Sequence, residues 1–224
     1  MSKEKNHILA VFLLENEKVA RDMLERLQRI DKLDKNVEIV DAAIADRTKR
    51  NRIKVKQTKD VGAMKGGFGG GAIGVMVGAI LLGPAGAVIG GMSGGTLSGL
   101  YTHLRDKGID DKFMRQTAEE LEKGKSVLFV QYVGDWSASR GAIEDAVKAV
   151  HAELIFSTLA AEHVEEVQES VETAAEELGG EETVTDYEVD TTPEDAVVVE
   201  ETPEADNFTV IKGIGPKTAE VLAA

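Results

Sequence analysis

The chain has 224 residues, contains no cysteine and carries a formal net charge of −14. This length allows one ordinary domain, alone or with a tail. The lack of cysteine excludes disulfides, thiolate metal sites and cysteine nucleophiles. Residues 1–151 carry 24 basic and 20 acidic side chains, whereas residues 152–224 carry 2 and 20, so the balances of +4 and −18 give the net charge. The sequence therefore divides into a nearly neutral body and an acidic C-terminal part.

Strands and helices alternate along the body. The apolar run His7 to Leu14 has the length of a strand. Helical spacing then follows in Val19, Met23, Leu24, Leu27 and Ile30, which predicts a helix over residues 16–30 with Asn16 as its cap. "NVEIVDAAIADRT" and "RIKVKQTKDV" predict two strands joined near "RTKRN". After a glycine-rich segment come a helix in "DDKFMRQTAEELEKG", a strand in "SVLFVQYVG", a helix in "SRGAIEDAVKAV" and a strand in "AELIFSTLA".

This order predicts an α+β fold. With the glycine-rich segment set aside, two βαβ units remain, which is the plan of a ferredoxin-like sandwich with a four-stranded antiparallel sheet and two helices on one face. We assign residues 5–161 to this domain and residues 62–104 to an insert within it. Residues 162–178 favour an acidic helix, and the composition of residues 179–206 is typical of a disordered acidic linker.

The insert predicts a helical hairpin built on glycine. No charged side chain lies between Lys65 and Arg105, and Gly83-Pro84 divides the run into halves of about 17 residues, each roughly 25 Å long as a helix. That length is near the lower limit for crossing a bilayer. A period of four relates Gly66, Gly70, Gly74, Gly78, Gly86, Gly90 and Gly94, and Gly91, Gly95 and Gly99 form a line beside them. Glycines so spaced let two backbones approach closely, so we expect a glycine zipper that drives homo-oligomerisation.

Basic residues flank the hairpin at its open ends, namely Arg50, Arg52, Lys54, Lys56, Lys65 and Arg105. They suit a hairpin whose ends meet anionic lipid on the cytoplasmic side of the inner membrane. The alternative is a soluble cytoplasmic homo-oligomer in which several hairpins share one core. A basic strand that merely faces water is a third interpretation of the charges.

The frame entered by "HILAVFLLENEKVARDML", the hairpin "GGFGGGAIGVMVGAILLGPAGAVIGG" and the following "SVLFVQYV" resemble the DUF1269 family of bacterial predicted membrane proteins. The resemblance covers roughly residues 5–178. It implies this fold and an association with membranes. It implies no catalytic residues, because the family has no established activity.

The C-terminal residues 207–224, "NFTVIKGIGPKTAEVLAA", resemble a helix-hairpin-helix peptide. In such a peptide Gly213, Gly215 and Lys217 would contact a phosphate or a partner. The 18 acidic residues between Glu162 and Asp206 would repel nucleic acid, so a protein partner or another copy is favoured. The acidic segment can also fold back onto the basic strand Arg47 to Lys59.

Chemistry-bearing motifs are sparse. The four histidines include no pair at ligand spacing, and no GxSxG motif is present. We therefore expect no catalytic, metal or cofactor site. The sequence predicts a non-enzymatic, homo-oligomerising structural protein at a membrane. The alternatives are a soluble scaffold or particle whose C-terminal peptide docks a partner, and a nucleic-acid-associated protein.

Overall fold

The computed structural model describes residues 6–34, 37–48, 52–57, 72–83, 93–121, 124–134, 136–178, 184–188 and 208–211. Their strands form one antiparallel seven-stranded sheet in the order β6-β3-β2-β4-β1-β5-β7. The strands are β1 (Asn6–Leu14), β2 (Val37–Arg47), β3 (Arg52–Gln57), β4 (Ser126–Gly134), β5 (Glu153–Leu159), β6 (Val184–Glu188) and β7 (Phe208–Ile211).

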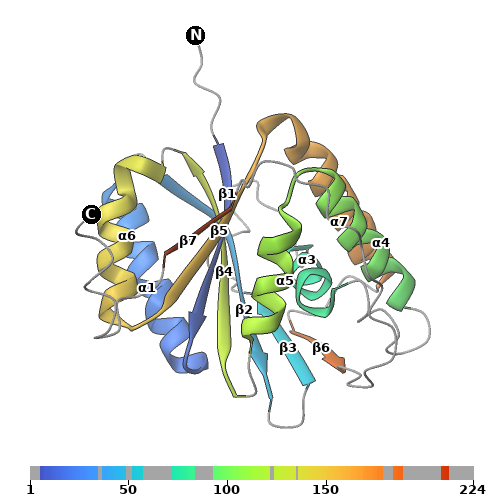
Figure 1. Ribbon diagram of the computed structural model, residues 1–224, viewed down its shortest axis with the longest axis horizontal. Coiled ribbons are helices and arrows are strands. Elements are labelled where there is room, and N and C mark those ends of the chain that lie inside the picture. Colours follow the sequence, from blue (N-terminus) through green and yellow to red (C-terminus); the bar gives the residue numbers. More distant parts are fainter. Residues whose placement is uncertain are drawn as a thin grey trace.

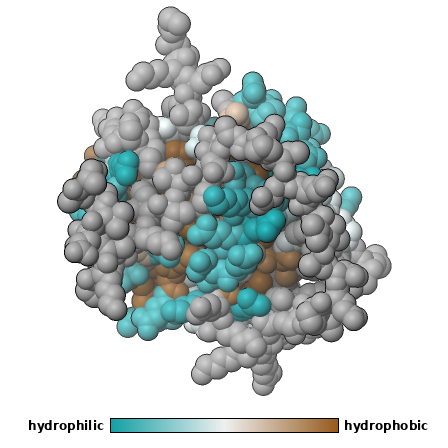
Figure 2. Space-filling model, viewed as in Figure 1, coloured by the Kyte–Doolittle hydropathy of each residue, from teal (hydrophilic) through white to brown (hydrophobic). Residues whose placement is uncertain are grey.

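Helices cover both faces of this sheet (Figure 1). On one face lie α1 (Glu17–Leu33) and α6 (Trp136–Ala149). On the other lie α3 (Ala72–Leu82), α4 (Ser93–Asp106), α5 (Asp111–Glu120) and α7 (Val164–Glu177). Figure 2 shows a hydrophilic band over the middle of the same view, where α5 lies, with hydrophobic side chains on either side of it.

The predicted strands and helices of the body are confirmed within a few residues. Asn16 caps α1, because its Oδ1 accepts a hydrogen bond from the Val19 amide at 3.2 Å. The buried face of α1 carries Met23, Leu24 and Leu27, as their spacing predicts. The strand "SVLFVQYVG" coincides with β4. β1 and β4 are the inner strands of the order β5-β1-β4-β2, with β1 paired to both β4 and β5.

The predicted pair of helices on one face of the sheet is present as α1 and α6, and a second layer, which the sequence analysis did not place, covers the other face. β4 is apolar on both faces: Leu128 and Val130 pack toward α1 and α6, whereas Val127 and Phe129 pack toward α3. All four side chains are fully buried. A strand buried on both faces needs a layer of helices on each, and the glycine-rich insert supplies part of the second layer.

Two helices that include residues of the insert lie in the described part of the chain. α3 has 11 residues, about 16 Å, and α4 runs from Ser93 through Arg105 to Asp106, past the predicted end of the insert. α3 is apolar all round, and Ile73, Met76 and Ile80 on it are fully buried. It contacts β2 and β3 on one side and α4, α5 and α7 on the others. No helix in the described ranges is long and apolar enough to span a membrane.

Two strands replace part of the predicted linker and terminal peptide. β6 lies within residues 179–206, and β7 begins the segment that was expected to be a helix-hairpin-helix peptide. The predicted fold-back onto the basic strand is confirmed, because β6 pairs with β3 in a register that sets Arg52 opposite Glu188 and Lys54 opposite Asp186. The rest of residues 179–206 and 212–224 lies outside the described residues.

Candidate functional site

The predicted zipper glycines are only partly described. Gly74 and Gly78 lie on the buried helix α3, and Gly94 lies in the first turn of α4. A Cβ on Gly74 would lie 3.7 Å from Val55 Cγ1 of β3. Gly74 therefore packs against the chain's own sheet. Gly66, Gly70, Gly86 and Gly90 lie outside the described residues.

The open glycine face belongs to α4. Gly95 and Gly99 are exposed, and no atom lies within 4 Å of the position that a Cβ would take on either. They line a groove of about 450 Å³ between α4 and α7, together with Thr96 of α4 and Ser170 and Thr173 of α7. Residues four apart lie on one side of a helix, so the two glycines form a continuous strip of bare backbone along the groove.

Polar contacts tie the two walls of the groove together. Near one end Thr96 Oγ1 donates to Glu177 Oε2 at 3.0 Å. Near the other, the Lys107 ammonium pairs with the Glu166 carboxylate, and this hydrogen bond holds the Glu166 pKa below its usual value. Behind these contacts α4 and α7 share the apolar cluster that also contains α3. The groove is thus a fixed surface feature between two packed helices.

Glycine at an exposed position inside a helix weakens that helix, so Gly95 and Gly99 require an explanation. Each glycine inside an exposed helix costs about 1 kcal/mol relative to alanine. Neither Gly95 nor Gly99 is among the glycines with positive φ, and neither is crowded by a neighbour. The fold of the single chain therefore gives no reason for glycine at either position.

The predicted basic residues separate onto different faces. Lys54 and Lys56 alternate with the buried Ile53 and Val55 of β3, so they lie on the face of the sheet that carries α1. Arg105 lies on α4, across the sheet, and pairs with Asp106 at 3.3 Å. The structure therefore does not gather these described charges around α3 and α4. Arg50 and Lys65 lie outside the described residues, and Arg52 stands opposite Glu188 in the sheet.

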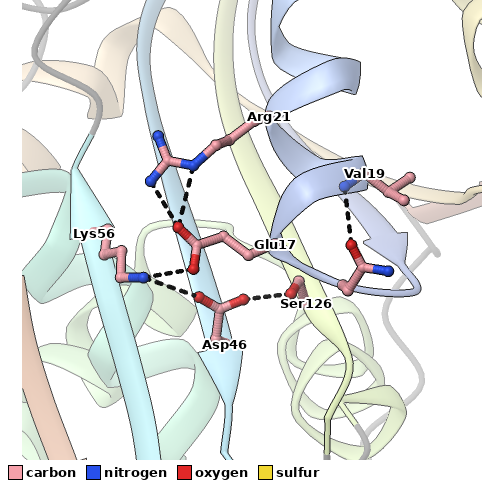
Figure 3. A network of polar contacts seen from close by, with 7 residues as sticks. Glu17, Val19, Arg21, Asp46, Lys56 and Ser126 are labelled. Atoms are coloured by element: carbon pink, nitrogen blue, oxygen red, sulfur yellow. Dashed lines mark hydrogen bonds and ion pairs between the residues drawn. The ribbon is translucent and has the colours of Figure 1, made fainter.

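Lys56 belongs to a polar network that joins α1 to β2 and β3 (Figure 3). Its Nζ lies 2.6 Å from Glu17 Oε2 and 3.6 Å from Asp46 Oδ2. Arg21 approaches the other Glu17 oxygen at 2.6 Å. The hydrogen bond from Lys56, followed by that from Arg21, lowers the Glu17 pKa. Burial raises the Asp46 pKa, although the Ser126 hydroxyl donates to its carboxylate. The network links α1, β2 and β3, and through Ser126 also β4.

Sequence reasoning missed a buried polar group in the centre of the sheet. Asp41 and Gln131 lie opposite each other on β2 and β4 and are 0% and 5% exposed. Gln131 Nε2 lies 3.5 Å from His7 Nδ1. His7, Gln131 and Met76 line a cavity of about 20 Å³. The signal was an acid inside the apolar strand "EIVDAAIA". No group of three potential metal ligands occurs among the residues that the structure describes.

The C-terminal contact residues Gly213, Gly215 and Lys217 fall outside the described part of the chain. Two acids near the start of α5 have structural roles. Asp110 caps α5 by accepting from the Phe113 amide at 3.0 Å, and Asp111 accepts from the Tyr101 hydroxyl at 2.9 Å. The contact between Tyr101 and Asp111 joins residues ten positions apart on two different helices, so no local sequence pattern predicts it.

Residues 67–172 match the family described as "Protein of unknown function (DUF1269)". The match covers just under half of the chain, runs from the insert through most of α7 and supports the resemblance stated from the sequence. It does not include β1, α1, β2 or β3. Neither a curated protein nor a solved structure gives a significant match to the chain.

Proposed function

We propose that this protein is a non-enzymatic structural module that self-associates, and that copies meet at the groove between α4 and α7. The observation that carries the proposal is the pair Gly95 and Gly99, exposed on α4 with open space above both. Bare backbone at this spacing lets a second helix approach closely and gain dispersion contacts that larger side chains would block.

The proposed partner is a second copy of the same surface. A contact around a two-fold axis requires a surface that complements itself. The groove region offers this, because Arg105 lies in the last turn of α4 and acidic residues line α7 along its length. An antiparallel approach of two grooves would pair these opposite charges at the rim and the glycines at the centre.

We also propose that the frame is ferredoxin-like. The proposal is supported by the order β5-β1-β4-β2 and by α1 and α6, which follow β1 and β4 and share one face of the sheet. On this view α3 and α4 are an insert placed after β3, whose helices cover the opposite face. Self-association would then be the property that the insert adds to a common frame.

The test is the mass of the particle in solution. Gly95→Leu/Gly99→Leu fills the strip with side chains, and we expect light scattering to report a smaller particle than for the unsubstituted protein. Gly141→Leu is the matched control, because Gly141 also lies on an exposed helix with nothing within 4 Å of its would-be Cβ. An unchanged mass in the double variant, or an equal loss in the control, would refute the groove as the contact.

Cell fractionation separates the two settings considered from the sequence. An assembly that sediments with membranes and floats with vesicles of anionic lipid would place the contact at a membrane surface. An assembly recovered in the supernatant without detergent would be a soluble scaffold. The glycine variants reduce particle size in both settings, so this measurement is independent of the first.

A further inference from the structure

The two C-terminal strands occupy the two outer positions of the sheet. β6 extends the sheet beyond β3, and β7 extends it beyond β5 (Figure 1). The core strands β3 and β5 are thus covered at their outer edges by segments from the acidic part of the chain. Uncovered edges present unpaired backbone groups that attract other strands.

The segments that connect β6 and β7 to the preceding element differ in length, and therefore in the distance at which each strand can pair. Six residues separate the end of α7 from β6, and at about 3.3–3.6 Å per residue they span at most about 20–22 Å. This holds β6 close to its own domain. Nineteen residues separate β6 from β7, and their fully extended reach is about 65 Å. The way across the sheet is shorter, since six strand spacings of about 4.8 Å amount to about 29 Å. The tether therefore reaches the β5 edge of its own chain with length to spare.

The contact made by β7 is a backbone ladder on one strand. Its register runs from Ser157 opposite Phe208 to Leu154 opposite Ile211. β5 is the only described element that β7 contacts extensively. The recipient edge carries no charge from Leu154 to Leu159, and a strand added to such an edge gains main-chain hydrogen bonds that any copy can provide.

We propose that β7 is exchanged between copies: in the assembled protein, residues 208–211 of one copy add to β5 of its neighbour. This inference rests on the proposed self-association, which brings the β5 edge of a second copy within reach of the tether. β7 makes the same backbone hydrogen bonds with β5 of its own chain as with β5 of another copy. Assembly raises the local concentration of β5 edges from other copies, and this favours exchange. β6 remains paired with β3 of its own chain, because its connection to α7 is short.

The test uses the absence of native cysteine. Phe156 and Thr209 are register partners in β5 and β7. Opposite Cα atoms in an antiparallel pair lie about 4.5–5.5 Å apart, within disulfide range. Two full-length single variants, Phe156→Cys and Thr209→Cys, with different affinity tags, are unfolded, mixed, refolded and oxidised. A disulfide between the two tagged chains requires that β7 of one copy pairs with β5 of the other.

We expect the mixed disulfide to exceed, by about tenfold or more, that of a control mixture in which Lys148→Cys on the exposed side of α6 replaces Phe156→Cys. A yield equal to the control would overturn the exchange. The double variant Phe156→Cys/Thr209→Cys, oxidised at high dilution, should close within one chain, and failure to close would overturn the register and the proposal with it. Light scattering on the unoxidised mixture measures self-association separately. If the chains form a multimeric particle but no mixed disulfide above the control, the exchange is refuted and the self-association is not.

Discussion

Leucine at Gly95 and Gly99 should change two measurable quantities in opposite directions. Each exposed helical glycine costs about 1 kcal/mol relative to a good helix former, so the double variant should stabilise the isolated chain by about 2 kcal/mol. The open space above both positions means that no clash offsets this gain. For a chain of this size, about 2 kcal/mol raises the melting temperature by roughly 4–8 °C. The same side chains occupy the strip that the proposed partner needs, so the assembly should be lost.

The assay is a pair of measurements on one preparation. Thermal unfolding at the lowest workable concentration reports the stability of the chain, and sedimentation velocity at high concentration reports association. Gly141→Leu should raise the melting temperature by about half as much and leave association unchanged, because Gly141 lies on α6, on the opposite face of the sheet. A double variant that melts higher and still assembles like the original protein would refute the role of the glycine strip. A double variant with a lower melting temperature than the unsubstituted protein would contradict the open space above Gly95 and Gly99, because it would mean that the leucine side chains clash.

Four further substitutions test the frame. Asn16→Ala removes the cap of α1 and should lower the free energy of unfolding by about 1 kcal/mol in denaturant titrations. Glu17→Gln should destabilise by less than about 1 kcal/mol at pH 7; because the folded pKa lies below 4.5, the difference should vanish as the pH falls through that folded pKa in a stability–pH series. For Asp46→Asn the pH dependence should be opposite. Burial raises the Asp46 pKa, so the free energy of unfolding of the unsubstituted protein increases as the pH falls through that pKa, and the variant lacks this increase. Phe129→Ala should cost about 3–5 kcal/mol, and a cost near zero would mean that the α3 face is open.

Local patterns predicted most of the body because each element there has its own signal. The helical spacing that begins at Val19 and the cap at Asn16 define α1, and both are set by residues within a few positions of one another. Short apolar runs bounded by turn residues define β1, β4 and β5 in the same way. The pairing of these strands then follows from the alternation of strands and helices along the chain.

The place of α3 could not be predicted from periodicity. A helix that is apolar all round fits a bilayer and the interior of a protein equally well. What decides between them is the number of strands with two apolar faces, because such strands need helices on both sides. Leu128 and Phe129 are adjacent and both fully buried on opposite faces of β4, and "SVLFVQYV" already contained that information.

The strands β6 and β7 were missed for a different reason. The composition of residues 179–206 is too polar to bury a core of its own, and that is the property from which disorder was inferred. A strand at the edge of an existing sheet needs no core, because the ladder and the register of charges are supplied by β3. Only the partner strand reveals such a segment, which is why the complementary charges of Arg52 to Lys56 were the useful signal.

The arrangement of layers restricts where copies can meet. In the described part of the chain both faces of the sheet lie under helices, and the outer edges of β3 and β5 are taken by β6 and β7. A second copy can therefore meet the described sheet only at its ends, and it can instead contact a helical surface or take the place of one of the edge strands. Of these last two routes, the strip on α4 offers the first, since two glycines one turn apart weaken the helix there without any benefit to their own chain. The long tether before β7 offers the second, and because the two routes use opposite regions of the fold they can act together, one to bring copies into contact and the other to link them.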